Sequence, residues 1–233
     1  ITNRSIGRDV KERLPVTLEF LVLVMLMQVP LGVGLGVLSA VFQNTVLDYG
    51  IRFTSILLLA IPSFWLATLV IILPSVWWSW SLPIGYSDLW DNPTRNLYQL
   101  SVPASIAAIS SAAVLMRVTR SQMLEVMRSD YVRTARAKGL SPRVVILRHT
   151  LHNALVPVIT VIGLTVAVGV GGAVIMEQVF SIPGIGSYTA SSLVSRDYPA
   201  IQAVTLLIGL SLCVVNLVVD LSYGLVDPRI RFK

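Results

Sequence analysis

The chain has 233 residues, of which 55% are hydrophobic and only 13% are charged. Its mean hydropathy is +0.76, whereas about 25% of the residues of an ordinary soluble domain are charged. This composition excludes a soluble globular domain and indicates a protein embedded in a membrane. The net charge of +6 does not indicate a nucleic-acid partner, because one segment beside the apolar runs accounts for it.

Five apolar runs follow one another along the chain, and a helix needs about 20 such residues to cross a membrane. The runs are Phe20–Phe42, Phe53–Trp80, Val102–Met116, Ala154–Met176 and Ala200–Val219. The third run is short, but Arg117 and Arg120 follow it, and we expect their aliphatic stems to let the charges reach the headgroups. The sequence therefore predicts an all-α, polytopic helical membrane protein with five spans.

Residues 1–19 precede the first run, and we expect them to form an external pre-helix segment. An odd number of spans places the N-terminus outside, so we expect a sixth spanning helix before Ile1. Residues 20–233 are predicted to be one transmembrane domain. Within it, Pro62 and Pro157 are the predicted places for bends.

The distribution of lysine and arginine predicts the orientation of the spans. The loop 117–150 carries eight basic residues against Glu125 and Asp130. With Arg52 and the three basic residues of the tail, one face has 12 basic residues and the other has six. The positive-inside rule then places this loop and the C-terminus in the cytoplasm. We therefore expect a multi-pass membrane protein with a cytoplasmic C-terminus.

The segment 130–142 reads as a short helix, a glycine stop and a second helix start. Ser129 or Asp130 is expected to cap the first helix with its side chain. Gly139 suits the left-handed position that ends a helix, and Ser141 with Pro142 suits the start of the next. A compact basic elbow on a membrane protein is a docking surface for a partner on the same side of the membrane.

No motif in the sequence predicts an enzyme. A Gly-x-x-x-x-Gly-Lys-Ser/Thr loop is missing, so the chain does not bind ATP phosphates by itself. The glycines of 32–36 lie inside an apolar run with no strand before them, which favours close helix packing over a dinucleotide loop. Two histidines and one cysteine do not make a structural zinc site. We expect no metal and no cofactor in this chain.

Several motifs carry a resemblance to a known family. Tyr131–Leu140 resembles the EAA loop of ABC importer permeases, with Arg133-Thr134-Ala135 in place of Glu-Ala-Ala and with the glycine at Gly139. Further matches in the same order are Arg148–Pro157, Glu177–Gly186, Arg196–Pro199 and Asp227–Arg231. His149–His152 stands where the general pattern has Ile-x-Leu-Pro, as in the peptide branch. The chain is most similar to the B-type subunit of dipeptide and oligopeptide permeases without its first helix.

The resemblance implies a type I ABC importer transmembrane domain whose elbow is the coupling helix. It also implies a bacterial or archaeal inner (plasma) membrane as the location. It implies these partners: a second homologous permease subunit, two cytoplasmic ATP-binding subunits, an external solute-binding protein and membrane lipid. ATP and Mg²⁺ would be bound by the ATPase subunits. The residues expected to dock the ATPase are Asp130, Tyr131, Arg133, Thr134, Ala135, Arg136, Ala137, Lys138 and Gly139.

The outer loop and the membrane interior supply the other candidate residues. Glu177, Pro183, Gly184 and Gly186 are assigned to an outer gate or loop, with a short helix expected near Tyr188–Val194. Gln28 and Asn216 are candidate pathway residues, because polar side chains are few inside the spans. Di- or oligopeptides are the leading substrates, with glutathione, nickel chelates and other small solutes left open. The alternatives are a stand-alone secondary transporter and a non-transport membrane scaffold.

Overall fold

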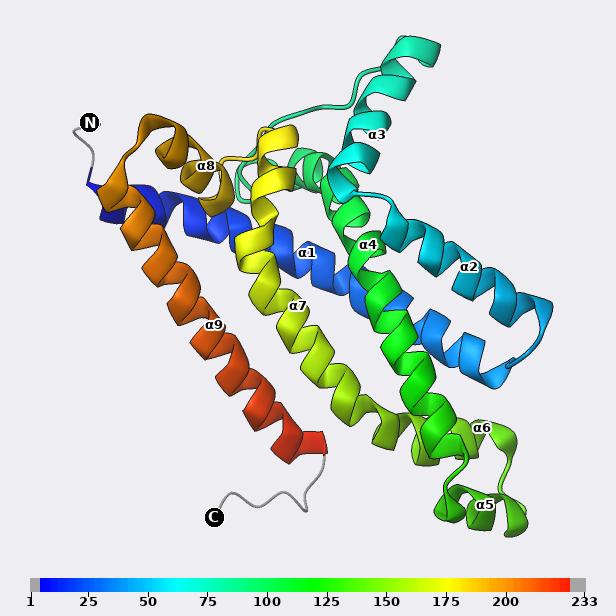
Figure 1. Ribbon diagram of the computed structural model, residues 1–233. Coiled ribbons are helices and arrows are strands. Elements are labelled where there is room, and N and C mark those ends of the chain that lie inside the picture. The colour runs from blue at the N-terminus through cyan, green and yellow to red at the C-terminus, as the bar shows by residue number, and fades with distance from the viewer. Residues whose placement is uncertain (1–4, 227–233) are drawn as a thin grey trace. The chain divides into compact units, whose positions relative to one another are not determined.

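The structure is a computed structural model that describes residues 5–226, without the side chains of residues 167, 168, 170–172 and 223–226. All regular elements of the described part are helices (Figure 1). In chain order they are α1 (Ile6–Val41), α2 (Val46–Ala60), α3 (Ser63–Trp78), α4 (Pro93–Met127), α5 (Asp130–Ala137), α6 (Pro142–Val144), the π-helix η1 (Val145–Leu151), α7 (His152–Val179), α8 (Ile185–Ser195) and α9 (Tyr198–Val226).

Within residues 5–226, four stretches are long and apolar enough to cross a membrane: Ile6–Val41, Pro93–Met127, Pro142–Val166 and Tyr198–Ser222. The pair α2 and α3 passes the same test only together, which raises the number of spans to as many as five. The predicted all-α, polytopic class is confirmed, and the upper count equals the five predicted spans.

The second predicted run is not one continuous helix. It is broken at Ile61 and Pro62, between α2 and α3. Proline has no N–H to donate, and its ring disfavours the helical conformation of the residue before it. Pro62 itself is extended, with φ −61° and ψ 134°. The bend predicted at this proline is therefore confirmed, and it divides the run into two helices.

The first helix also differs from the expectation. α1 begins at Ile6, so residues 6–19, which were expected to precede the span, belong to the same helix as the apolar run. The helix continues through Pro15, although a proline inside a helix removes one backbone hydrogen bond and crowds the preceding turn. Likewise, α4 continues past the third predicted run as far as Met127.

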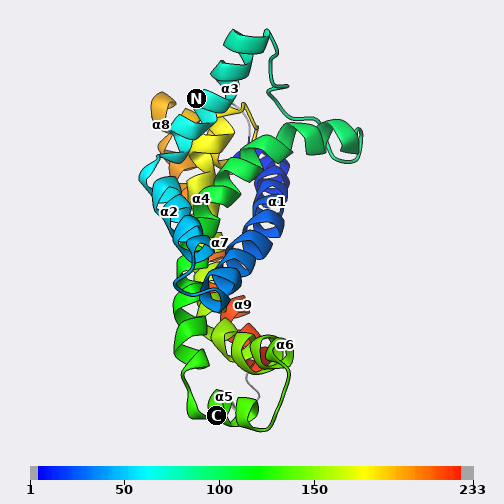
Figure 2. The same cartoon turned by 90° about the vertical axis from the view of Figure 1, so that its right-hand side faces the viewer.

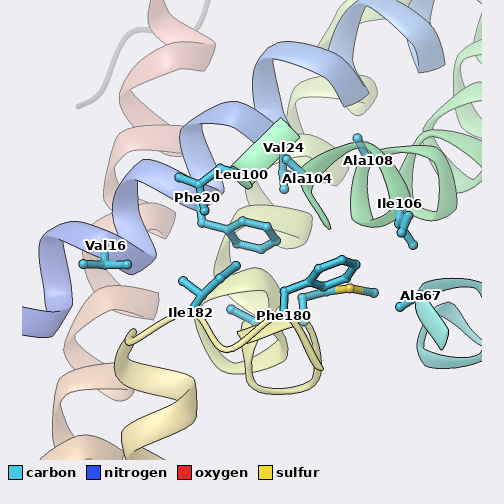
Figure 3. Packing of buried hydrophobic residues seen from close by; sticks show 12 residues of the cluster. Val16, Phe20, Val24, Ala67, Leu100, Ala104, Ile106, Ala108, Phe180 and Ile182 are labelled. Carbon is cyan, nitrogen blue, oxygen red and sulfur yellow. The ribbon is translucent and has the colours of Figure 1, made fainter. Parts of the chain in front are cut away.

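The chain divides into two compact units, and α1, α4, α7 and α9 contribute residues to both. The first unit contains the residues up to Met27, together with Ile61–Ala108 and Val166–Val214. Its core is apolar and takes residues from α1, α3, α4 and the end of α7. Figure 3 shows Phe20, Phe180 and Ile182 converging there, and each is at most 2% exposed. Among membrane-spanning helices such side chains hold the unit together through close packing rather than through removal from water.

The second unit contains Gln28–Ala60, Ile109–Thr165 and the residues from Val215 onward. In it α1 and α4 approach closely at two glycines. A Cβ atom at Gly32 would lie 2.8 Å from the Leu115 Cβ, and one at Gly36 would lie 2.6 Å from the Thr119 Cβ. The prediction that the glycines of this segment serve helix packing is confirmed at both positions.

An ion pair ties α2 to α4 in the same unit. The fully buried Asp48 carboxylate accepts hydrogen bonds from the Arg120 guanidinium at 2.9 and 2.8 Å and from the Ser39 hydroxyl at 2.5 Å. Arg120 thus has a partner that the sequence did not suggest, and removing it would leave a buried carboxylate unpaired, which is strongly destabilising. The sequence alone gave no sign of this pair, whose members are 72 positions apart.

Candidate coupling elbow and outer segment

The elbow helix α5 is held against its unit by a narrow apolar face. Val132 is fully buried and Ala135 is 5% exposed, and both pack with Val145 at the start of η1. Figure 2 shows α5 between the end of α4 and α6. Residues 132 and 135 lie three positions apart, so they share one side of the helix. The remaining sides of α5 are left to solvent or to a partner.

The start of α5 is not capped in the way that the sequence predicts. Ser129 occupies the N-cap position with extended backbone, but no side chain bonds to the free N–H groups of the first turn. The Ser129 hydroxyl instead donates to the Val126 carbonyl at 2.6 Å. It therefore satisfies the C-terminal end of α4. Asp130 is 97% exposed at its side chain, 3.5 Å from the Arg133 guanidinium.

The end of α5 agrees with the prediction. Gly139 has φ +77°, the left-handed conformation that suits glycine. Its N–H donates to the Arg136 carbonyl at 2.9 Å, and the Leu140 N–H donates to the Ala135 carbonyl at 3.4 Å. These two bonds form a Schellman motif. A Cβ atom at Gly139 would meet nothing within 4 Å, so the conformation, rather than a lack of space, requires glycine.

Most of the predicted docking residues lie on the open face of α5. The exposed members are Asp130, Tyr131, Arg133, Thr134, Arg136, Ala137, Lys138 and Gly139. Tyr131 is 47% exposed and is the one large aromatic side chain among them. Ala135 is the exception, because it belongs to the small core of the elbow. The elbow thus presents three basic side chains, an acidic one and an aromatic ring together.

The segment 177–199, which the sequence assigned to an outer loop and which we call the outer segment, is organised around Glu177, fully buried at the end of α7. One carboxylate oxygen accepts from the Thr17 hydroxyl at 2.7 Å, and the other accepts from the Ser187 N–H at 2.8 Å. The Thr17 hydroxyl in turn accepts from the Ile185 N–H at 2.8 Å. The free N–H groups at the start of α8 are therefore satisfied by side chains from α7 and α1.

The glycines of this segment are needed for the approach of that carboxylate. A Cβ atom at Gly184, the N-cap of α8, would collide with the Glu177 carboxylate. A Cβ atom at Gly186 would lie 2.6 Å from the Val174 Cα. Pro183 lies between Ile182 and Gly184, and the Gly184 N–H donates to the Ile182 carbonyl across it at 2.9 Å. The four residues that the sequence assigned to an outer loop thus form one turn, closed by a buried carboxylate.

The electrostatics of this turn are set by burial and by the helix end. Glu177 lies just beyond the predicted span Ala154–Met176, and its burial raises the pKa of the carboxyl group above its usual value. The hydrogen bonds from Thr17, Ser187 and Gly186 oppose this effect on the pKa, since they favour the charged form. The N-terminus of a helix also favours a negative charge. Burial and these hydrogen bonds thus act on the Glu177 carboxyl group in opposite directions, and burial has the larger effect.

The helix expected near Tyr188–Val194 is confirmed, because α8 covers Ile185–Ser195. It ends at Arg196, which has φ 55°, and the Asp197 N–H donates to the Ser192 carbonyl at 2.9 Å. Sequence reasoning missed Thr17, which lies 160 positions before its partner Glu177. No local pattern marks such a partner.

The candidate pathway residues lie in different surroundings. Gln28 is 2% exposed, and its amide donates to the Thr165 hydroxyl at 2.8 Å. It therefore holds α1 to α7 in the second unit. Asn216 is exposed on α9. Within residues 5–226 no group of three His, Cys, Asp or Glu side chains is placed to hold a metal. The motif Asp227–Arg231 lies outside the described residues.

Long apolar helices, an exposed basic elbow and a bonded short helix beyond the fourth predicted span define a polytopic helical membrane protein. The family described as binding-protein-dependent transport system inner membrane component matches residues 32–232. The chain belongs to this family, and the resemblance drawn from its motifs is confirmed.

Three similar proteins support this placement. A putative peptide transport system permease protein of Brucella abortus is 39% identical over 232 residues, covering 100% of this chain and 74% of that protein. The oligopeptide transport system permease protein of Bacillus subtilis is 41% identical over 94% of this chain and 70% of its own length. The dipeptide transport system permease protein of Bacillus subtilis is 40% identical over 96% and 70%, respectively.

Proposed function

We propose that this chain is one membrane-spanning permease subunit of an ATP-driven importer for di- or oligopeptides or related small solutes. It pairs with a second, homologous permease subunit to enclose the pathway. Two cytoplasmic subunits bind ATP and Mg²⁺ and hydrolyse ATP, and an external binding protein delivers the solute. The chain itself is non-catalytic. The observation that carries the proposal is about 40% identity to peptide permeases over nearly the whole chain.

The geometry of α5 supports its assignment as the coupling helix. A coupling element must move as a body and present groups that a partner can bind. The buried pair Val132 and Ala135 fixes α5 to η1, and the Schellman motif at Gly139 ends it sharply. Tyr131 and the three basic side chains stay exposed, and tyrosine and arginine are enriched among residues that dominate binding at interfaces.

The outer segment is assigned to the opposite, non-cytoplasmic side. The 12-to-6 distribution of basic residues over the two faces supports this side through the positive-inside rule. We also assign this segment to the border of the pathway, as the family resemblance implies. Substrate choice is assigned to the external binding protein. Of the two candidate pathway residues, Gln28 already bonds to Thr165, which leaves Asn216 as the more accessible polar group.

The deciding experiment is uptake of a radiolabelled dipeptide into proteoliposomes that receive the subunits one at a time. We expect uptake against a gradient only when both permease subunits, the ATPase subunits, ATP and the loaded binding protein are all present. Replacing the binding protein by a compatible relative should change the preferred solute, whereas Asn216→Leu should change it little. Concentrative uptake by this chain without an ATPase would overturn the proposal in favour of a secondary transporter.

Orientation is tested separately on intact cells with a membrane-impermeant thiol reagent. Single cysteines at Lys138 and at Val194, which is 88% exposed, are introduced in a Cys213→Ala background. We expect labelling at position 194 and none at position 138 until the membrane is opened. The reverse pattern would invert the assigned orientation without affecting the family assignment.

A further inference from the structure

An apolar groove lies between α1, α2 and α4 in the second unit and has a volume of about 640 Å³. Leucines of α1, Leu47 and Ile51 of α2, and Ala113 and Met116 of α4 contribute to its lining. Two hydroxyl groups also line it, but Thr54 donates to the Gly50 carbonyl and Ser55 donates to the Ile51 carbonyl. The groove therefore presents an aliphatic surface whose few polar groups are already satisfied.

A basic cavity of about 950 Å³ adjoins the groove. Met116 lines both, and the consecutive residues Ile51 and Arg52 line one each. The charged side chains of the basic cavity are Arg52, Arg117, Arg120, Arg128 and Glu125. Along α4 the lining thus changes from aliphatic at positions 109–116 to basic at positions 117–128.

The positive charge of this cavity is not cancelled by its own lining residues. Arg120 is bonded to the buried Asp48 by two hydrogen bonds. Arg52, Arg117 and Arg128 then face only Glu125, which leaves a net charge of +2 among these four lining residues. The Arg52 guanidinium lies 5.8 Å from the centre of the Tyr49 ring, a cation–π contact that favours its position at this end of α2.

We propose that the groove and the basic cavity together bind one anionic phospholipid. Its phosphate lies among Arg52, Arg117 and Arg128, and one acyl chain lies in the groove. A soluble anion would leave the aliphatic groove empty, and a zwitterionic lipid would leave the positive charge uncompensated. The basic end is also the side that the lysine and arginine distribution assigns to the cytoplasm, where the leaflet attracts basic segments through its anionic lipids. The site is argued from this chain alone, whereas its test in the complete transporter rests on the proposed function.

Two glycines offer a matched pair of variants for the acyl chain. Gly50 lines the groove, and a Cβ atom there would meet nothing within 4 Å. Gly50→Leu should therefore fold normally while filling the groove. Gly34 of α1 is equally open but does not line the groove, so Gly34→Leu is the control. The headgroup contact is tested with a two-arginine variant that combines Arg52→Gln and Arg117→Gln. Its control combines Arg143→Gln and Arg148→Gln, which removes the same charge at residues outside the cavity.

The measurement is electron paramagnetic resonance of the complete transporter in phosphatidylcholine nanodiscs. A trace amount of spin-labelled lipid is added, either phosphatidylglycerol or phosphatidylcholine. The two labelled lipids have identical acyl chains with the spin label at the same position, so they differ only in the headgroup. We expect a larger immobilised fraction for phosphatidylglycerol in the unaltered protein. The two-arginine variant should lose that preference by about five-fold for each arginine, and Gly50→Leu should lower immobilisation of both lipids. Both control variants should resemble the unaltered protein, and glycerol 3-phosphate should not compete.

Three results would overturn the lipid site. The first is equal immobilisation of the two lipids in the unaltered transporter. The second is a loss of lipid immobilisation in Gly50→Leu that is no larger than in Gly34→Leu, or a loss of the preference for phosphatidylglycerol in the two-arginine variant that is no larger than in its own control. The third is crosslinking of a cysteine at position 50, in the Cys213→Ala background, to another subunit without any lipid contact. That outcome would assign the groove to a protein interface.

Discussion

The two short helices α5 and α8 both connect longer helices, but they are held by different kinds of contact. α5 buries only Val132 and Ala135 against Val145 and has no side-chain cap at its start. The start of α8 is bonded by Glu177 and Thr17, which belong to two other helices. The elbow is therefore held by a small apolar contact and a backbone turn, whereas α8 is held by a buried polar network.

The difference bears on how each helix moves. Shifting α8 away from α7 would leave a buried carboxylate and backbone N–H groups without partners, which costs about 1–3 kcal/mol for each group. We therefore infer that α8 moves together with α1 and α7. Burying the valine of α5 contributes about 1.5–3 kcal/mol, and the polar face remains unused by its own unit. A lightly held helix with an open polar face suits an element that a partner displaces.

The largest expected effect comes from Glu177→Gln. Glutamine keeps the size of the side chain but turns an N–H₂ group toward donors, so one charge-assisted contact is lost and a donor faces a donor. The loss should be about 3 kcal/mol, or about 100-fold faster amide hydrogen exchange in α8. Hydrogen–deuterium exchange followed by mass spectrometry measures it.

The matched control for this change is Glu12→Gln. Glu12 pairs with Arg8 at the surface, and their side chains are 56% and 76% exposed, so the loss should be at most about 1 kcal/mol. Exchange in α5 should stay unchanged in both variants. Equal exchange of α8 in the two variants would contradict the clamp.

The second prediction concerns Thr17→Val. Valine has nearly the same shape, but it loses the donor to Glu177 and the acceptor for the Ile185 N–H. The expected loss is about 2 kcal/mol, or about 30-fold faster exchange in α8. Thr68→Val is the control, because its exposed hydroxyl bonds only within α3. In a Glu177→Gln background the Thr17 change should have a clearly smaller effect, since the two residues share one network; full additivity would argue against that network.

The two regions also differ in how far the sequence predicts them. The glycine stop at Gly139 and the restart at Ser141 and Pro142 were predictable, because each depends on the conformation of one or two neighbouring residues. The break at Pro62 was predictable for the same reason. The side-chain cap of α5 was not predictable, because a serine hydroxyl can either accept from the N–H groups of the helix that follows or donate to a carbonyl of the helix before it. Ser129 does the second, and its hydroxyl donates to the Val126 carbonyl of α4.

The missed features depend on residues far apart in the chain. Glu177 and Gly184 stood out as a motif, but Thr17 carries no local signal of its role. The same holds for the ion pair of Asp48 and Arg120. The sequence predicted only that the charge of Arg120 reaches the lipid headgroups, and it did not predict a partner for it. The π-helix η1 was also missed. Its backbone hydrogen bonds join residues five positions apart instead of four, and no residue pattern in Val145–Leu151 marks this change. Composition and periodicity predict helices and spans, whereas buried polar partners follow from tertiary packing.

A smaller effect is expected from Gly139→Val. Valine is β-branched and avoids the left-handed conformation at φ +77°, which costs about 1–2 kcal/mol. Exchange at the end of α5 should rise about ten-fold while α8 stays protected, and stimulation of ATP hydrolysis by loaded binding protein should fall. Gly139→Asn is the control, because asparagine tolerates this conformation better. Unchanged exchange and stimulation in the valine variant would show that the sharp end of α5 is dispensable.

The smallest effect on stability is expected from Tyr131→Ala, and it separates folding of the elbow from docking. The Tyr131 side chain is 47% exposed and outside the apolar cluster of α5, so its removal should change stability by at most about 0.5 kcal/mol. If the open face docks an ATPase, loss of a tyrosine should still weaken assembly by about 2 kcal/mol, measured by titrating the ATPase subunit onto the permease pair. The neighbouring Val132→Ala serves as the opposite case, since this buried residue holds α5 to η1 and its loss should first raise hydrogen exchange. The opposite result would be normal ATPase binding by Tyr131→Ala together with weak binding by Val132→Ala. It would mean that docking depends on the shape of the elbow rather than on its exposed aromatic side chain.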